Sequence, residues 1–195
     1  MIVKNHMVLV GSQEKPTLIT NEGEAVAPPP RLVLELDVFL RLECYFRSTD
    51  KEFQVLGFVE THDNSFVVRD LVVPKHSSGA AYTEIDQNAF PALLDELEKA
   101  GKDIEKLRLQ IHSHGDLPAY FSPEDVNTIR TAYACDWMIS FVGNRACDWY
   151  ARLDVFEPIP LSIALPIFIS LPTVTPGQEE EWMCELKNRM GRSFL

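Results

Sequence analysis

The sequence predicts a single α+β domain in which a mixed central β-sheet is flanked by helices. Three observations support this class. Strand-like segments interleave with segments of helical periodicity, and several strands are paired as hairpins across short turns. In addition, 46% of the 195 residues are hydrophobic, which is enough for one sizeable core. No internal repeat or low-complexity segment is visible.

The first 30 residues are predicted to form a hairpin and a connector ahead of the main domain. Residues 7–20, MVLVGSQEKPTLIT, hold two apolar runs around the turn-forming segment GSQEKP. Residues 21–30, NEGEAVAPPP, are polar and rich in proline. The main domain is therefore expected to span residues 31–195 and to include a C-terminal helix.

The first half of the main domain is expected to contain three strands and two helices. In order, they are a strand at 31–36, a helix at 37–48, two strands at 52–60 and 65–73 around the turn THDN, a loop at 74–83 and a helix at 87–101. Asp37 and Asp86 are the predicted caps of the two helices. Pro91 falls early enough in the second helix to be tolerated.

The second half is predicted to continue the same alternation. Its expected elements are a strand at 107–112, a helix at 122–134, strands at 137–142 and 149–156 around the turn GNRA, one or two strands within 159–172, and a helix at 179–190. Prolines interrupt the apolar run 159–172, so it is not predicted to span a membrane. In the last helix an apolar stripe at helical spacing is expected to pack in the core; it comprises Trp182, Met183, Leu186 and Met190.

Charge and cysteine content limit the partners and the compartment. The formal net charge is −11 and the pI is about 4.9, which disfavours nucleic acid and anionic membranes as partners and favours a basic partner. The spacing of the four cysteines suggests no disulfide framework, and they are interpreted as reduced core thiols: Cys44, Cys135, Cys147 and Cys184. With no visible secretory signal, these features favour the cytoplasm.

Two histidines at the end of a predicted strand indicate a metal site. His112 and His114 are two residues apart, so in extended backbone they face the same side. Burying two imidazoles without a metal or an acid is costly. With one carboxylate they make a three-ligand set that leaves a fourth position for water, as in catalytic zinc sites. The other histidines, His6, His62 and His76, are interpreted as ordinary surface residues.

A helix start follows the histidines. Ser122, Pro123 and Asp125 match a capping box with proline at the first helical position. This capping role is sufficient to explain the serine, and it does not exclude a chemical role for the same side chain.

The segment 112–125, HSHGDLPAYFSPED, resembles the JAMM signature of JAB/MPN-domain metalloproteases, H-x-H-x7-S-x-x-D. A chance match is expected in on the order of one in a thousand chains of this length. The resemblance covers roughly residues 31–157 and implies a single MPN-like, cytidine-deaminase-like domain. It also implies that Zn²⁺ is bound by His112, His114 and Asp125, and that Ser122 donates a hydrogen bond to the tetrahedral intermediate.

The resemblance further implies a catalytic glutamate at the start of the strand that follows the first helix. Glu52 and Glu60 are the candidates, about 26 Å apart if the strand is continuous. Glu52 opens the strand as the family pattern expects and is predicted to be the general base, whereas Glu60 is interpreted as a solvated turn acid. The chain departs from the family pattern at Val55, where glycine is common, and at Gly115, where proline often follows H-x-H.

The activity implied is that of a prokaryotic or phage-type zinc metalloprotease, a deubiquitinase-like isopeptidase. Its expected partner is a ubiquitin-like protein or its conjugate, because such tails are commonly basic and end in glycines. The loop 74–84 is expected to form one wall of the site. Alternatives are a catalytically inactive MPN scaffold, and a protease of the same chemistry acting on phage structural proteins or on sulfur-carrier proteins. Oligomeric state is left open.

Overall fold

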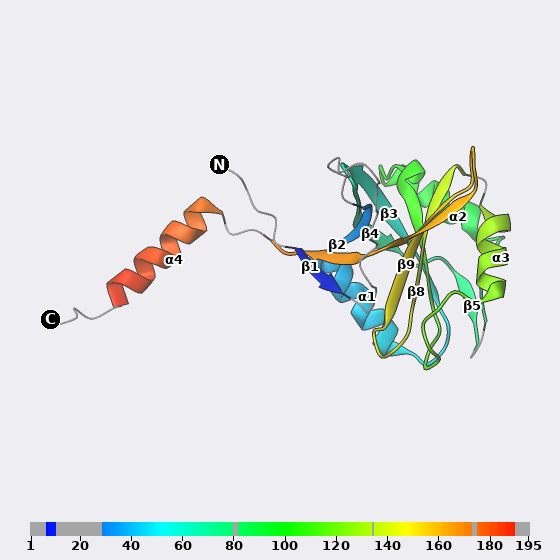
Figure 1. Cartoon of the computed structure of the whole chain (residues 1–195), viewed down its shortest axis with the longest axis horizontal. Helices are drawn as coiled ribbons and strands as arrows, with labels where there is room; N and C mark the ends of the chain where they lie inside the picture. Colours follow the sequence, from blue (N-terminus) through cyan, green and yellow to red (C-terminus); the bar gives the residue numbers. More distant parts are fainter. Residues whose placement is uncertain (1–6, 11–28, 80–81, 134, 173–174, 190–195) are drawn as a thin grey trace, which may run out of the picture.

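The computed structural model describes residues 7–10, 29–79, 82–133, 135–172 and 175–189. As the sequence predicts, the architecture is α+β with one large mixed sheet (Figure 1). Its strands lie in the order β1 (Met7–Val10), β11 (Ile167–Ser170), β2 (Arg31–Glu35), β4 (Ser65–Val72), β3 (Gln54–His62), β7 (Leu107–Ser113), β8 (Trp137–Gly143), β9 (Trp149–Val155) and β10 (Leu161–Leu165). Parallel pairs are β11 with β2, β2 with β4, and β7 with β8.

The sheet curls because one continuous segment of chain supplies the strand at one end and the second strand from the other end. β10 pairs with β9 and β11 pairs with β2, yet only Pro166 separates β10 from β11. The carbonyl of Pro166 accepts a hydrogen bond from Leu32 N at 3.0 Å. The predicted apolar run 159–172 therefore forms two strands divided at Pro166. Proline suits this position because it has no N–H to donate to a neighbouring strand.

The core fills the inside of the curled sheet. Helix α1 (Leu36–Ser48) faces it through Val38, Leu42 and Phe46, which recur every four residues. The sheet meets them with its inward, alternate residues, which include Leu32, Leu34, Val55, Val68, Leu109, Ile111, Ile139, Phe141, Trp149 and Ala151. The outward residues of β7, β8 and β9 are left to form the opposite face.

Five of the described elements lie outside the core of the sheet. They are the short paired strands β5 (His76–Ser78) and β6 (Thr83–Ile85), helix α2 (Phe90–Lys99), the 3-10 turn η1 (Ile104–Lys106) and helix α3 (Pro123–Ala132). Two of them, β6 and α3, line the candidate site. The predicted loop 74–83 thus contains a strand and the start of its partner. The predicted turn THDN is confirmed as a tight hairpin between β3 and β4, with Asp63 at a φ of 49°.

Both predicted aspartate caps differ from the observed helix starts. Glu35 is the N-cap of α1 and makes no side-chain cap bond, so Asp37 lies inside the first turn. There its charge still suits the positive end of the helix dipole. Asp86 accepts hydrogen bonds from Asn88 N and Ala89 N and so closes a turn ahead of α2, which begins at Phe90.

The first and last elements that the structure describes are β1 and the C-terminal helix α4. The second half of the predicted N-terminal hairpin and most of the connector lie outside the described residues, and β1 pairs with β11. Helix α4 (Pro176–Arg189) stands apart from the sheet in Figure 1. Its stripe residues Trp182, Met183 and Leu186 are exposed, so the predicted core packing is wrong; Met190 is not among the described residues.

The prediction of core thiols is wrong for Cys44, Cys135 and Cys184, whereas Cys147 packs against the core. Cys44 and Cys184 are exposed, and Cys135 and Cys147 are partly buried; all four are free thiols. Cys44 lies two residues from both Leu42 and Phe46, which places it on the opposite side of α1 from the core. Among the described helices, none is long and apolar enough to cross a membrane.

Candidate metal centre

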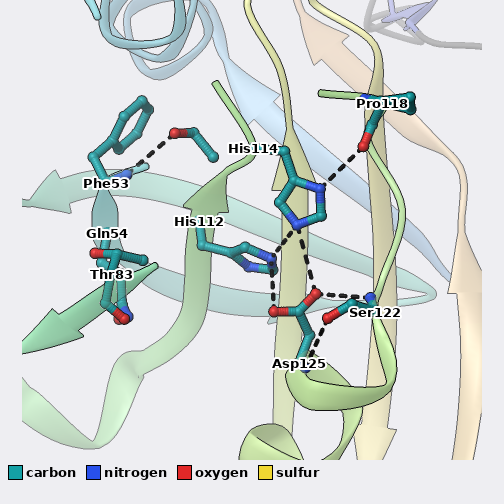
Figure 2. Close-up of polar contacts among 9 residues, drawn as sticks. Phe53, Gln54, Thr83, His112, His114, Pro118, Ser122 and Asp125 are labelled. Carbon is teal, nitrogen blue, oxygen red and sulfur yellow. Dashed lines mark hydrogen bonds and ion pairs between the residues drawn. The ribbon is translucent and has the colours of Figure 1, made fainter. Parts of the chain in front are cut away.

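The end of β7 brings the two predicted histidines to the outer face of the sheet. His112 and His114 are 4% and 7% exposed, and their rings point toward Asp125 at the start of α3 (Figure 2). Inward-facing Ile111 lies in the core, so the strand alternation predicted from the sequence is confirmed. Helix α3 delivers Asp125 from its first turn.

The three side chains have the separations of ligands around one small cation. His112 Nε2 lies 3.3 Å from His114 Nε2 and 3.3 Å from Asp125 Oδ1, and His114 Nε2 lies 3.5 Å from Asp125 Oδ2. Zinc ligands lie 2.0–2.1 Å from the ion in tetrahedral sites, so two of them stand about 3.3–3.4 Å apart. In the described part of the chain this is the one His/Cys/Asp/Glu group close enough to share an ion.

The hydrogen bond at the second ring nitrogen of His114 suits a metal ligand, whereas Nδ1 of His112 is buried without a partner among the described residues. His114 Nδ1 lies 3.0 Å from the carbonyl oxygen of Pro118, to which it must donate, so Nε2 presents its lone pair to the centre. The pKa of His114 is raised, chiefly by its bond to Asp125. Burial would raise the pKa of Asp125, but its contacts with the imidazoles of His112 and His114 lower it far below its usual value. The carboxylate is therefore held ionised, as a ligand must be.

Ser122 has the predicted capping box. Its Oγ accepts from Asp125 N at 3.1 Å, and Asp125 Oδ2 accepts from Ser122 N at 2.7 Å. The capping box therefore also orients the Asp125 carboxylate toward the histidines. The Ser122 hydroxyl also donates to the Asp125 carboxylate and helps to lower its pKa. Ser122 lines the cleft, so the same hydroxyl can turn to a ligand there.

Glu52 lines the same cleft as the triad. This cleft has a volume of about 300 Å³, and Ser122 is among its lining residues. Glu52 lies two residues before β3, and its backbone N donates to Gly79 O at 2.9 Å. Burial raises the pKa of its carboxyl, and the nearby His114 and His112 oppose that rise. A carboxylate held beside two imidazoles is suited to proton transfer.

Glu60 lies elsewhere and has other partners. It is inside β3, where its carboxylate accepts from Arg69 Nε at 2.9 Å and from Lys106 Nζ at 3.1 Å. These bonds lower its pKa. Glu60 is not among the residues that line the cleft, and it belongs to a surface ion-pair network rather than to the triad.

Ser113 and Gly115 contact the segment 50–53 that contains Glu52, and these contacts were not predicted from the sequence. Ser113, between the histidines, faces the other way: its Oγ donates to Lys51 O at 3.2 Å and accepts from Phe53 N at 3.1 Å. Gly115 has a φ of +55°, and a Cβ there would come within 2.1 Å of Asp50 O. The departure from proline at Gly115 thus has a physical reason, because proline cannot adopt a positive φ. The alternation of a strand already indicates that Ser113 must face away from His112 and His114.

Replacing Gly115 by alanine is expected to destabilise the chain and displace Glu52. A left-handed conformation costs an L-residue about 1–2 kcal/mol, and the contact with Asp50 O adds to this cost. Gly101→Ala is the matched control, because Gly101 has a φ of +76° but no atom within 4 Å of the added Cβ. Denaturant unfolding should show a clearly larger loss for Gly115→Ala. Equal losses would contradict the close approach of residue 50.

The other departure from the family pattern is accommodated by the core. Val55 is 1% exposed and faces inward, so its side chain contributes to packing and does not approach the triad. Glycine occurs two positions later instead, where a Cβ on Gly57 would come within 2.8 Å of Leu109.

Comparison with known proteins gives a likeness of fold alone. No family model matches the chain, and no curated protein matches its sequence. Among solved structures it is similar to the solution structure of the protein DSY2949 from Desulfitobacterium hafniense, with a TM-score of 0.52 and 13% identity. The match covers 72% of this chain and 94% of that chain.

Proposed function

We propose that this chain is a zinc-dependent metallopeptidase of the JAMM type that hydrolyses an amide or isopeptide bond. The observation that carries the proposal is the His112–His114–Asp125 triad, whose spacing fits one tetrahedral ion. The residues expected for proton transfer and oxyanion stabilisation, Glu52 and Ser122, line the same cleft. The cleft also gives the zinc chemistry access to a substrate.

The roles of the side chains follow from their positions. Zinc on the triad would polarise a carbonyl and lower the pKa of a bound water. Glu52 takes the proton from the attacking water and passes it to the leaving nitrogen. Ser122 turns its hydroxyl from the Asp125 carboxylate to the carbonyl oxygen and donates to it as negative charge develops there. The bond from His114 to Pro118 O keeps the imidazole in one tautomer and orientation throughout.

The hollow beside the cleft supports a peptide tail as the substrate. It has a volume of about 720 Å³, lies between β6, α2 and α3, and shares Gln54, Thr83 and Gln110 with the cleft. Apolar side chains form much of its lining, and Glu84, Glu105 and Glu124 add acidic groups. We infer that it receives the tail of a ubiquitin-like protein, extended and basic, with its terminal glycines at the triad.

The purified chain is expected to hold about one zinc ion on the triad. His112→Ala combined with His114→Ala removes two of the three ligands, so zinc should be lost while the β-sheet content is kept. Elemental analysis and far-UV circular dichroism measure the two properties. His62→Ala with His76→Ala is the matched control, because neither residue belongs to the metal group. Undiminished zinc in the first double variant would refute the assignment.

The activity is tested with an isopeptide probe: a basic tail peptide ending in Gly-Gly, joined to the ε-amino group of a lysine peptide. The zinc-loaded chain should cleave it, and an acidic-tail version should be cleaved more slowly. A chain that holds zinc and binds the tail without cleaving it would support an inactive MPN scaffold. Faster cleavage of a phage structural protein or of a sulfur-carrier precursor would redirect the substrate assignment. The proposed setting is the cytoplasm.

A further inference from the structure

A buried polar network lies on the outer face of the sheet beside the triad. Asp154 on β9 is 3% exposed, and three donors surround it. Its Oδ2 accepts from Ser140 Oγ at 2.8 Å and from Arg152 Nε at 3.0 Å, and its Oδ1 accepts from Ser162 Oγ at 2.7 Å. The proposed reaction uses none of these residues. A buried charge with this many partners holds its neighbours in fixed positions.

The network reaches the metal centre through one aromatic ring. The Arg152 guanidinium carbon lies 4.5 Å from the centroid of the Phe121 ring. The Phe121 and His112 ring centroids are 6.1 Å apart. Phe121 also immediately precedes Ser122, the N-cap of α3. Phe121 therefore contacts both the Arg152 guanidinium and the His112 ring, and it adjoins the start of α3, the helix that carries Asp125.

The position of this ring matters because Asp125 depends on the first turn of α3. The capping box secures that turn from within the helix, and Ile129, 2% exposed, anchors the helix one turn later. Residues 116–122, which lead into the helix, contain no helix or strand. Movement of this lead-in segment would withdraw Asp125 from His112 and His114.

We propose that Phe121, held by Arg152 and Asp154, is a positioning residue of the metal centre. It fixes the start of α3 so that the Asp125 carboxylate stays opposite the two histidines. The inference rests on the proposed zinc site. Arg152 needs no contact with the substrate, because its guanidinium acts on the face of the Phe121 ring. Partial burial of Arg152 strengthens this cation–π attraction.

Phe121→Leu tests the proposal by metal affinity rather than by turnover. Outer contacts of metal ligands typically change affinity by roughly 10–100-fold, and a loss of this size is expected when zinc is titrated against a chromophoric chelator. The visible spectrum of the Co²⁺-loaded chain should also change, because the geometry at the ion changes. Phe121→Tyr keeps the aromatic face, so its zinc affinity and Co²⁺ spectrum should match those of the wild type.

Phe168→Leu is the matched control. Phe168 on β11 also lies under an arginine, with Arg31 5.8 Å from its centroid, but it is remote from the triad in the strand order. Its replacement should leave zinc affinity and the Co²⁺ spectrum unchanged. Arg152→Gln with Asp154→Asn should weaken zinc binding without leaving a buried carboxylate unpaired. Adding Phe121→Leu to that pair should then cost little more, since the same contact is already lost.

The outcomes separate this inference from the proposed function. Zinc in the wild-type chain, together with equal affinities for Phe121→Leu and Phe168→Leu, overturns the positioning role and leaves the zinc site intact. A wild-type chain that binds no zinc overturns both. Weakened zinc binding with an unchanged Co²⁺ spectrum in Phe121→Leu also counts against the proposal, because a displaced Asp125 must alter the ligand field.

Discussion

Replacing Glu52 by glutamine is expected to lower cleavage of the isopeptide probe by roughly 10²–10⁴-fold, the usual contribution of a general acid–base group. Glutamine keeps the size and polarity of the side chain but cannot take up the proton of the attacking water. Zinc content should be unchanged, because Glu52 is not one of the triad residues. Thermal stability should change little, because the Glu52 side chain makes no hydrogen bond to another described residue.

Glu60→Gln is the control for this substitution. It also removes one negative charge, but this charge is inside β3 and contacts Arg69 and Lys106 at the surface. Surface ion pairs contribute little to stability, so activity and folding should both stay near wild type. A silent Glu52→Gln combined with a defective Glu60→Gln would reverse the assignment and show that proton transfer does not occur in the cleft beside the triad.

The fold was predictable where local pattern and burial agree. The strand at 107–112 was expected from its alternation, and the observed β7 extends it by one residue to Ser113. The N-terminus of α3 was expected from Ser122, Pro123 and Asp125, since a capping box is encoded within four residues. Asp37 and Asp86 were misassigned as helix caps because aspartate suits turns and first helical turns as well as N-caps.

The triad could be predicted because its residues are close in sequence, but the contacts that support it could not. His112 and His114 are related by strand alternation, and Asp125 by a motif. Arg152 and Phe121 come from distant segments, and their contact depends on how β9 lies beside β8 and the lead-in to α3. No pattern in either segment specifies it. Gly115 is similar, since its close approach to Asp50 depends on tertiary packing.

Ser122→Gly is expected to reduce cleavage by roughly 10²–10³-fold while the chain stays folded. Loss of one oxyanion donor costs about 2.7–4 kcal/mol of transition-state stabilisation. As a helix cap, glycine is only a few tenths of a kcal/mol worse than serine, whereas alanine costs about 1 kcal/mol. Glycine therefore removes the hydroxyl with little effect on α3. Turnover, zinc content and thermal unfolding should be measured on the same preparation.

Ser122→Asp and Ser122→Thr distinguish the two roles of the hydroxyl. Aspartate caps a helix well but places a negative charge against the oxygen that becomes an oxyanion, so the fold should persist while cleavage collapses. Threonine keeps both the cap and a donor, and it should retain most activity. If Ser122→Gly and Ser122→Asp cleave the probe at the wild-type rate with full zinc, Ser122 serves only the capping box. The oxyanion would then have to be stabilised by the metal or by backbone N–H groups.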